Sequence, residues 1–256
     1  MMASSAIDRI WEIRPRSFVY LFSGGKDSAA ALALTRNVVR EIVEELKAKV
    51  YILYVYVTGN THPLNAYCAS KVMYWHREHY GFEPVLRARN KVFQEYMAKY
   101  GLMIGPQRWC YLEFKEKVFR EFHRILPRPV LYIDGMKPSD SKHRKEMITE
   151  ELQYVRAYSR EYWSWHPLFS YSHDDVFSIL SKYEEFDCVL RLYEVFGDSL
   201  NCIVCPYRSN SRLVKYHLAE DLSIVYDFMK QTMRSLRWLK LYSFAKNKTL
   251  VLSKDG

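Results

Sequence analysis

The sequence predicts a Rossmann-like α/β fold in which helices cover both faces of a parallel, twisted sheet, followed by a helical C-terminal segment. Short apolar runs alternate with longer segments of helical character, and this alternation is typical of parallel sheets with crossover helices. Three of the apolar runs are followed at once by glycine-containing turns, at Gly24, Gly59 and Gly135. Because the carboxyl ends of parallel strands meet at one edge of a sheet, we expect these turns to line one ligand crevice.

The individual elements are assigned from apolar patterning and from signals at their ends. Residues 50–57 are continuously apolar and rich in β-branched and aromatic side chains, which indicates a strand buried on both faces. Gly81 is expected to end the helix before it, and Ser172 to begin a later helix. In chain order we expect strands at 17–22, 50–57, 82–87 and 129–133, and helices at 28–47, 64–79, 91–100, 111–124, 172–183 and, in the tail, 211–242.

Size and composition bound the domain organisation. The chain has 256 residues, 49% of them hydrophobic and 26% charged, so it can bury a substantial core. The strand–helix alternation breaks down after about Arg160, which predicts an α/β core at 1–160 and a C-terminal segment at 161–256 packed on it. The sequence has no run of 18 apolar residues, and residues 1–16 lack the apolar stretch of a signal peptide. We therefore expect no membrane partner and a cytoplasmic location.

The chain is basic, with a formal net charge of +9 and an isoelectric point of about 9.2. A basic surface favours polyanions such as tRNA or DNA, or simply anionic nucleotides. A generally basic protein without a nucleic-acid face fits the same count equally well, so both interpretations stay open. The sequence does not specify the oligomeric state, and a homodimer is compatible with it.

Residues 23–28 have the composition of a phosphate-binding loop between a strand and a helix. Glycines let the backbone approach oxygens closely, and the N–H groups at a helix N-terminus favour a bound anion. The lysine adds a positive charge, the serines add hydroxyls, and the aspartate can cap the helix. The spacing is neither that of a Walker A loop nor that of a dinucleotide fingerprint, and six suitable residues in one context disfavour an incidental glycine turn. The loop consists of Ser23, Gly24, Gly25, Lys26, Asp27 and Ser28.

A second cationic segment follows the strand expected at 129–133. Gly135 opens this segment, and Lys137, Lys142 and Arg144 supply charges suited to phosphate recognition. In isolation it would be interpreted as a solvated basic loop. Its position after a strand, in a chain that already has a phosphate loop, favours a role at the same site.

The five cysteines argue against a disulfide scaffold and in favour of a metal or reactive thiols, because an odd count in a cytosolic protein is unusual for a disulfide framework. Cys202 and Cys205 form a C-x-x-C pair, to which Cys110 can add a third thiolate. Three thiolates suit a [4Fe–4S] cluster with one open iron. Zinc is less favoured, since a structural zinc site takes four ligands, and a redox-active dithiol is the third interpretation. Cys68 and Cys188 have apolar neighbours and are interpreted as small buried side chains.

Several segments together resemble the phosphoadenosine phosphosulfate (PAPS) reductase-like branch of the PP-loop, or adenine nucleotide alpha-hydrolase-like, superfamily. The resemblance runs from residue 18 to about residue 210, and its motifs occur in the family's order. It implies a loop that holds a pyrophosphate group while chemistry takes place at the α phosphate. The segments that carry the resemblance are Ser23–Ser28, Thr58–Pro63, Arg108–Cys110 with Lys115, Gly135–Arg144, Pro167–Phe177 and Cys202–Cys205.

The resemblance also implies which residues act, with ATP and Mg²⁺ as ligands and a [4Fe–4S] cluster as a further cofactor. Residues expected to bind the nucleotide are Ser23, Gly24, Gly25, Lys26, Asp27, Ser28, Thr58, Gly59, Gly135, Lys137 and Arg144. Residues expected to take part in catalysis are Lys26, Asp27, Lys137, Arg144 and Cys110. Residues expected to hold a metal centre are Cys110, Cys202 and Cys205.

The sequence departs from the family pattern at several positions. Val57 stands where the family has Asp, which puts a ribose or metal contact in doubt. Lys137 replaces Arg and Asp140 replaces Glu, and Tyr171 stands in place of Trp. No cysteine follows Cys205, whereas the sulfonucleotide reductases of the family carry a catalytic cysteine in the tail. Those reductases also have a degenerate phosphate loop, and this chain keeps the loop intact.

The intact loop and the missing tail thiol together favour an ATP-dependent enzyme over a reductase, because a reductase needs a thiol to attack sulfur. The expected activity is activation of an acceptor with release of pyrophosphate, followed by sulfur transfer from a sulfur donor or thiol protein. A tRNA or DNA acceptor would suit the basic surface. One alternative is a PAPS or adenylyl-sulfate reductase that uses an external thiol. Another is a non-catalytic, nucleotide-binding regulatory protein, towards which Val57 points.

Overall fold

The computed structural model describes residues 5–100, 109–157 and 160–202 of the chain. The strands are β1 (Ser17–Phe22), β2 (Lys49–Tyr56), β3 (Glu83–Ala88), β4 (Val130–Ile133), β5 (Leu152–Ala157) and β6 (Arg160–Trp165). The helices are α1 (Ala6–Ile13), α2 (Lys26–Leu46), α3 (Pro63–Tyr80), α4 (Phe93–Tyr100), α5 (Lys117–Ile125), α6 (Lys142–Met147), α7 (His173–Leu180) and α8 (Asp187–Phe196). A π-helical turn at Tyr111–Glu116 leads into α5, and 3₁₀ turns lie at Pro138–Asp140 and Glu184–Phe186.

The strands form one six-stranded sheet in the order β3-β2-β1-β4-β6-β5. β5 pairs antiparallel with β6, and the other neighbours are parallel. From β1 the chain steps outward to β2 and β3, and it then returns to add β4 and β6 on the other side of β1. This reversal creates a switch point between β1 and β4, and ligands of open α/β sheets bind outside the strand ends at such a point. The turns after β1 and β4 carry Gly24 and Gly135, as the sequence predicts.

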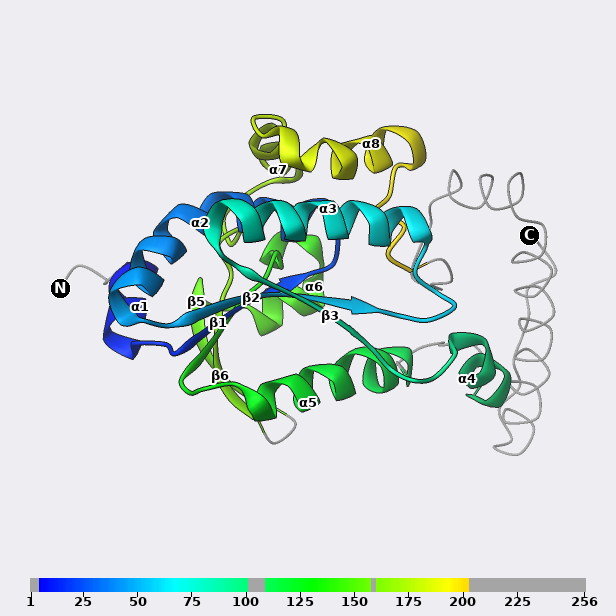
Figure 1. Ribbon diagram of the computed structural model, residues 1–256, viewed down its shortest axis with the longest axis horizontal. Coiled ribbons are helices and arrows are strands. Elements are labelled where there is room, and N and C mark those ends of the chain that lie inside the picture. Colours follow the sequence, from blue (N-terminus) through cyan, green and yellow to red (C-terminus); the bar gives the residue numbers. More distant parts are fainter. Residues whose placement is uncertain (1–4, 101–108, 158–159, 203–256) are drawn as a thin grey trace.

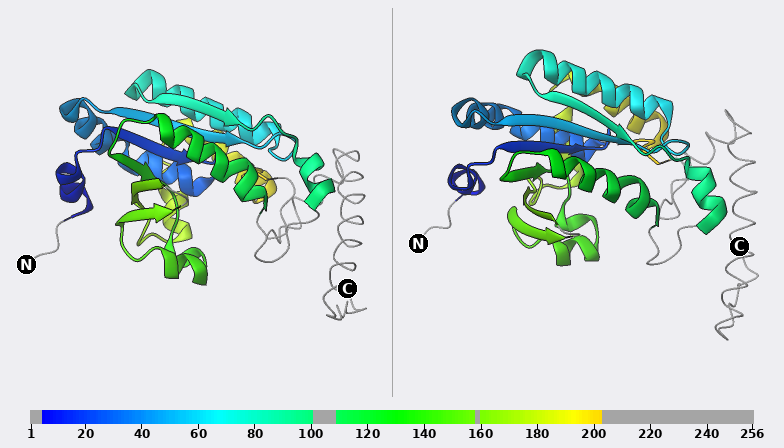
Figure 2. Two further views of the ribbon diagram at one scale, coloured as in Figure 1. Left: turned by 90° about the horizontal axis from the view of Figure 1, so that it is seen from below. Right: turned by 60° about the horizontal axis from the view of Figure 1, so that its bottom comes forward.

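Helices cover both faces of the sheet, which confirms the predicted fold class. Figure 1 shows α2 and α3 along one face and α5 along the other, with α7 and α8 stacked beyond α2 and α3. In the further views of Figure 2, α5 stays on the side of the sheet opposite α3. Alternate residues of β1 enter the two cores: Phe18 and Tyr20 pack on the α2 side and Val19 packs on the α5 side.

The start of α2 lies close to the sheet because its side chains are small. Ala29, Ala30 and Ala31 are all buried, with at most 1% of their surface exposed. Their methyl groups allow the helix backbone, and therefore the loop that precedes it, to approach the ends of β1 and β4. The other predicted helix signals are confirmed: Gly81 adopts a left-handed conformation (φ +69°) after α3, and Ser172 caps α7.

The strands predicted at 17–22, 50–57, 82–87 and 129–133 are confirmed, as are the helices predicted before residue 200, with ends shifted by a few residues. The sequence analysis missed α1, α6, α8 and the hairpin of β5 and β6. β6 belongs to the sheet although it lies where the alternation was expected to break down. The helix predicted at 211–242 lies outside the described residues, and the division of the chain at residue 160 stays a prediction.

A disulfide bond between Cys68 of α3 and Cys188 of α8 corrects the expectation of two separate buried thiols. The two residues are 120 positions apart, so their spacing in the sequence carries no local signal. The expected apolar surroundings of the two cysteines are confirmed, because Cys68 is 2% exposed and both residues pack in the apolar core. The bond ties together two helices that lie beside the loop Ser23–Ser28.

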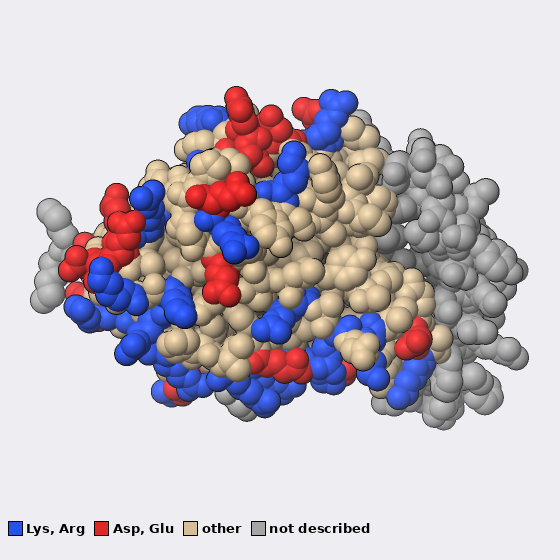
Figure 3. Space-filling view, viewed as in Figure 1, with Lys and Arg blue, Asp and Glu red and all other residues tan. Residues whose placement is uncertain are grey.

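The surface seen in Figure 3 carries both signs of charge, with Lys and Arg gathered along the left and lower edges and interrupted by Asp and Glu. Within the described ranges, no helix has the length and apolar character that crossing a membrane requires.

Candidate functional site

The loop Ser23–Ser28 connects β1 to the N-terminus of α2 and is closed by its own hydroxyl groups. The Ser28 hydroxyl donates to the carbonyl oxygen of Gly25 at 2.9 Å and accepts from the backbone N–H of Ser23 at 3.1 Å. Gly24 has φ +70°, a conformation that favours glycine, and Gly25 is the extended N-cap of α2. The loop therefore directs backbone N–H groups at the start of a long helix, where an anion is stabilised.

Two asparagines that the sequence analysis missed hold the outer side of this loop. The Asn65 side-chain amide donates to Ser199 O at 2.7 Å and lies 3.4 Å from Gly24 O, while its oxygen accepts from the Tyr54 hydroxyl at 2.6 Å. The Asn201 amide donates to Ser23 O at 2.8 Å. A β-carbon on Gly24 would lie 2.7 Å from Asn65 Nδ2, so glycine is required here for space as well as for conformation.

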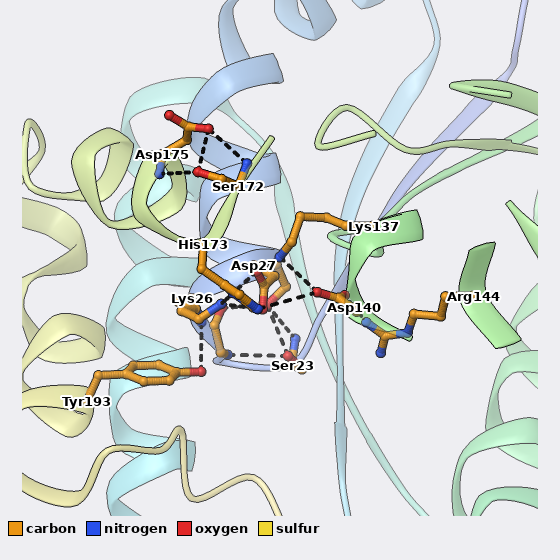
Figure 4. Close-up of polar contacts among 12 residues, drawn as sticks. Ser23, Lys26, Asp27, Lys137, Asp140, Arg144, Ser172, His173, Asp175 and Tyr193 are labelled. Atoms are coloured by element: carbon orange, nitrogen blue, oxygen red, sulfur yellow. Dashed lines mark hydrogen bonds and ion pairs between the residues drawn. The ribbon is translucent and has the colours of Figure 1, made fainter. Parts of the chain in front are cut away.

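Two lysines from different parts of the chain converge on Asp27. Lys26 Nζ lies 2.9 and 3.0 Å from the two carboxylate oxygens of Asp27, and Lys137 Nζ also donates to this carboxylate (Figure 4). The Lys137 side chain is fully buried. Burial of Asp27 opposes its ionisation, but the hydrogen bonds from Lys137 and Lys26 outweigh burial and hold the pKa of this carboxyl below its usual value.

The segment after β4 adds a second carboxylate and a third strong cation. Asp140 Oδ1 lies 3.2 Å from Lys137 Nζ, and Asp140 also forms an ion pair with Arg144. Lys137 thus bridges Asp27 and Asp140. The Arg144 side chain is 42% exposed and lies at the open side of the cluster (Figure 4). The structure therefore brings together four of the predicted site residues: Lys26, Asp27, Lys137 and Arg144.

α7 and α8 contribute two further side chains that the sequence analysis missed. His173 Nδ1 lies 3.0 Å from Lys26 Nζ, and the His173 ring is largely exposed. The Tyr193 hydroxyl accepts from the Lys26 backbone N–H at 3.2 Å, and burial raises the pKa of this tyrosine to about 12. The Lys26 ammonium also lies 5.7 Å from the centre of the Phe177 ring. These contacts fix Lys26 from the side opposite Lys137.

The turn after β2 is held against α4. The Thr58 carbonyl oxygen accepts from the Phe93 backbone N–H at 2.9 Å, and the Gly59 carbonyl oxygen accepts from the Gln94 amide at 2.6 Å. Gly59 has φ +81°, which favours glycine. Val57 is buried beside Phe93 in a small apolar cluster. This packing explains why an apolar side chain suits a position at which the PAPS reductase-like family has Asp.

The predicted metal centre lies only partly within the described residues. Cys110 precedes the π-helical turn and is half-buried, as is Cys202, whose thiol lies 3.4 Å from Asn201 Oδ1. Cys205 lies outside the described residues. In the part of the chain that the structure describes, no three His, Cys, Asp or Glu side chains are grouped so that they could hold a metal ion. The centre formed by Cys110, Cys202 and Cys205 stays a prediction.

A pocket of about 390 Å³ opens beside the phosphate loop. This volume is within the range of small-molecule sites. It lies over the carboxyl ends of β1 and β4 and along β6, on the face that α5 covers. We refer to it as the β4–β6 pocket; its lining consists of Leu21, Ser23, Asp27, Ser28, Tyr111, Phe119, Tyr132, Asp134, Gly135, Met136, Arg144, Met147, Arg160, Tyr162 and Ser164.

Comparisons with known proteins find distant similarity. No protein-family model matches the chain. An uncharacterized protein of Methanocaldococcus jannaschii is 23% identical over 201 residues, which make up 78% of this chain and 38% of that protein. The FMN adenylyltransferase of Candida glabrata in complex with FAD and inorganic pyrophosphate superposes with a TM-score of 0.43 at 14% identity, over 70% of this chain and 59% of that chain. Its complex with ATP gives a TM-score of 0.39. The chain spans less than two thirds of the length of each of these relatives.

Proposed function

We propose that this chain binds Mg-ATP at the loop Ser23–Ser28 and uses it to activate an acceptor, with release of pyrophosphate. The observation that carries the proposal is the convergence of Lys26 and the buried Lys137 on one point at the N-terminus of α2. Buried cations beside a helix N-terminus suit a polyphosphate, because the helix N–H groups and the ammonium groups all stabilise negative charge.

The chemistry proposed at the α phosphate follows from this arrangement. An acceptor oxygen attacks the α phosphorus, the bond between the α and β phosphates breaks, and pyrophosphate leaves. Lys26, Lys137 and Arg144 neutralise the charge that builds on the phosphate oxygens, while the loop N–H groups hold the departing pyrophosphate. Lys26 and Lys137 are held by largely buried contacts before the nucleotide arrives, so their positions need little reorganisation in the transition state.

The carboxylates of Asp27 and Asp140 fit the Mg²⁺ that accompanies ATP. Mg²⁺ takes oxygen ligands and is usually held by one or two carboxylates together with substrate phosphates. Both carboxylates form ion pairs with Lys137 in this structure. When bound, the ion supplies additional neutralisation of phosphate charge.

Sulfur transfer is the finer part of the proposal. A sulfide donor would displace AMP from the activated acceptor: a carbon–sulfur or phosphorus–sulfur bond forms as the bond from that atom to the AMP oxygen breaks. With a persulfide donor the same displacement leaves a sulfur–sulfur bond to the donor protein, and a second thiol of that protein then cleaves it and is oxidised to a disulfide. Its support is the resemblance of the motifs to the PAPS reductase-like family and the position of Cys202 directly after Asn201, which contacts the phosphate loop. A tRNA or DNA acceptor, an iron–sulfur centre and a thiol-bearing donor protein belong to this proposal.

Thermal unfolding with three ligands tests the function. We expect Mg-ATP to stabilise the protein by about 2.7 kcal/mol at 100 times its Kd, and hence by about 5–10 °C. The shift should vanish in Lys26→Ala and persist in Lys71→Ala, in which an exposed lysine of α3 is removed. A shift with PAPS or adenylyl sulfate but not with Mg-ATP would replace the proposal with a sulfonucleotide reductase.

A further inference from the structure

The β4–β6 pocket shares Ser23, Asp27 and Ser28 with the phosphate loop. The same pocket extends away from that loop across β4 to β6, where Arg160 and Ser164 line it. A ring bound at the β6 end of the pocket therefore lies next to the proposed phosphate site and leaves the N-terminus of α2 to the phosphates. It occupies the side of β1 away from β2 and β3.

Aromatic rings form much of the wall of this pocket. Tyr132 and Tyr162 meet edge to face, with ring centres 4.9 Å apart and planes at 86°. Phe119 of α5 and Tyr111 of the π-helical turn line the opposite side. π-helical turns inside helices occur frequently at functional sites, since they redirect side chains. Rings of this kind bind a flat ligand by stacking and edge contacts.

The far end of the pocket carries a buried charged group with an unused donor. Arg160 is 6% exposed and forms an ion pair with the buried Glu116, its Nη2 lying 2.8 and 2.7 Å from the two carboxylate oxygens. Arg160 Nε is also buried, and it has no hydrogen-bond partner among the residues that the structure describes. Because a buried N–H without a partner costs free energy, this donor indicates a ligand with an acceptor atom at that end.

We propose that the β4–β6 pocket binds the acceptor as a planar heteroaromatic ring that carries a carbonyl group at its buried edge. The inference deepens the proposed function and rests on it, because only the proposed reaction identifies the ligand of this pocket as the acceptor. The aromatic walls select a flat ring, and Arg160 selects a hydrogen-bond acceptor because a guanidinium only donates. A ring carbonyl, as in guanine or uracil, meets that requirement. Adenine has no ring carbonyl: its amino group donates and its acceptors are ring nitrogens, so it lacks the group that the proposal requires.

The pocket thereby gives the acceptor and ATP separate places. The phosphates bind at the loop and contact its cations. The ring binds between the aromatic side chains of the β4–β6 pocket. Two ligands that use separate places bind together, and two ligands that share a place exclude each other.

Calorimetric titration of uncharged nucleosides tests the proposal. Guanosine, uridine and adenosine are titrated into the full chain with and without a saturating α,β-methylene analogue of ATP and Mg²⁺. We expect guanosine and uridine to bind in both conditions and adenosine to bind at least tenfold more weakly. Binding of guanosine and uridine only in the absence of the analogue would overturn the proposal, as would no binding, or equal binding of adenosine.

Two variants locate the binding. Met147 lines the pocket and is 54% exposed, so Met147→Trp should narrow the pocket without disturbing the core. We expect it to weaken guanosine binding at least tenfold and to leave affinity for the ATP analogue within twofold. Val195→Trp, at a residue of α8 that is 50% exposed, is the matched control and should change neither. Unchanged guanosine binding in Met147→Trp would contradict the assignment.

A further variant tests the role of Arg160. Arg160→Gln combined with Glu116→Gln removes both charges of the buried pair and should reduce the preference for guanosine over adenosine. If this double variant does not fold, Met147→Trp still decides where the ring binds. Failure of the ATP analogue to bind the unmodified protein would count against the proposed function alone, because the analogue is titrated separately from the nucleosides.

Discussion

Gly135 lies against the backbone of Asp27, so that the turn after β4 touches the first turn of α2. A β-carbon on Gly135 would lie 2.3 Å from the Asp27 carbonyl carbon, 2.4 Å from its oxygen and 2.6 Å from Ser28 N. This close approach brings the two strand ends of the switch point together. It also explains how Lys137, two residues further on, reaches the Asp27 carboxylate from the other strand.

Gly135→Ala is therefore expected to separate these turns. The added methyl group meets backbone atoms, which cannot rotate away, so we expect a loss of stability of about 1–3 kcal/mol together with loss of most of the thermal shift caused by Mg-ATP. Gly81→Ala is the control, because Gly81 has φ +69° but open space around it. It should cost about 1 kcal/mol from backbone strain and leave the Mg-ATP shift intact. An unchanged Mg-ATP shift in Gly135→Ala would contradict the importance of this contact.

Lys137→Met removes the buried bridge between Asp27 and Asp140 while keeping most of the side-chain volume. Both carboxylates then lose a cation, and we expect a loss of about 1–3 kcal/mol, below the range for a fully buried pair because Asp27 is 31% exposed. Mg-ATP stabilisation should also be lost. Urea unfolding and thermal shift measure the two effects, with Lys145→Met, at an exposed lysine of α6, as the control. Equal Mg-ATP shifts in the two variants would exclude a phosphate contact for Lys137.

The parts of the site that the sequence predicts are those with a local signal. The glycines, lysine and serines of Ser23–Ser28 lie in one strand-to-helix turn, and Gly135, Lys137 and Arg144 follow a clear apolar strand. Asn65, Tyr193 and Asn201 carry no such signal. Each is an ordinary polar residue of a helix or loop until the fold brings it to the phosphate loop, so only tertiary structure identifies them.

The same physical reason explains the missed strands. β6 begins with two charged residues, followed by two aromatic ones, a serine and a tryptophan. This order lacks the strict alternation of a half-buried strand, so the segment is difficult to recognise when its neighbours are unknown. Its place in the sheet is decided by pairing with β4, which lies far away in the sequence, and with β5, which the sequence analysis also missed. Strand formation depends on cross-strand partners more than on intrinsic preference.

Cys68→Ala tests the disulfide with Cys188, which joins α3 to α8. The closed loop spans 120 residues, and loss of such a bond typically costs about 2–5 kcal/mol. Because Asn65 lies one turn before Cys68 and Tyr193 lies on α8, we also expect a weaker thermal shift with Mg-ATP. Dithiothreitol should lower the melting temperature of the unmodified protein and have little further effect on Cys68→Ala. An equal effect of dithiothreitol on both proteins would show that other thiols are responsible.

His76 predicts how stability depends on pH. Burial, assisted by the Arg36 charge and opposed by a hydrogen bond to Val72 O, lowers its pKa from 6.5 to about 4. The folded state therefore keeps the ring neutral where the unfolded state takes up a proton. The contribution of His76 to the free energy of unfolding should be fully present above pH 6.5 and should be lost as the pH falls towards 4. The loss amounts to about 3 kcal/mol, at 1.36 kcal/mol per pKa unit.

His76→Gln should remove this part of the acid sensitivity, measured as the slope of the unfolding free energy against pH between 6.5 and 4. His79 provides a matched control, because its Nδ1 lies 2.8 Å from Trp75 O, just as His76 Nδ1 lies 2.8 Å from Val72 O, four residues earlier in each case. The His79 ring is exposed, and its charge is only a minor cause of the lowered His76 pKa, so His79→Gln should change the slope much less than His76→Gln does. Equal slopes for the two variants would mean that another buried group, such as His123, whose pKa burial also lowers to about 4, dominates the acid response.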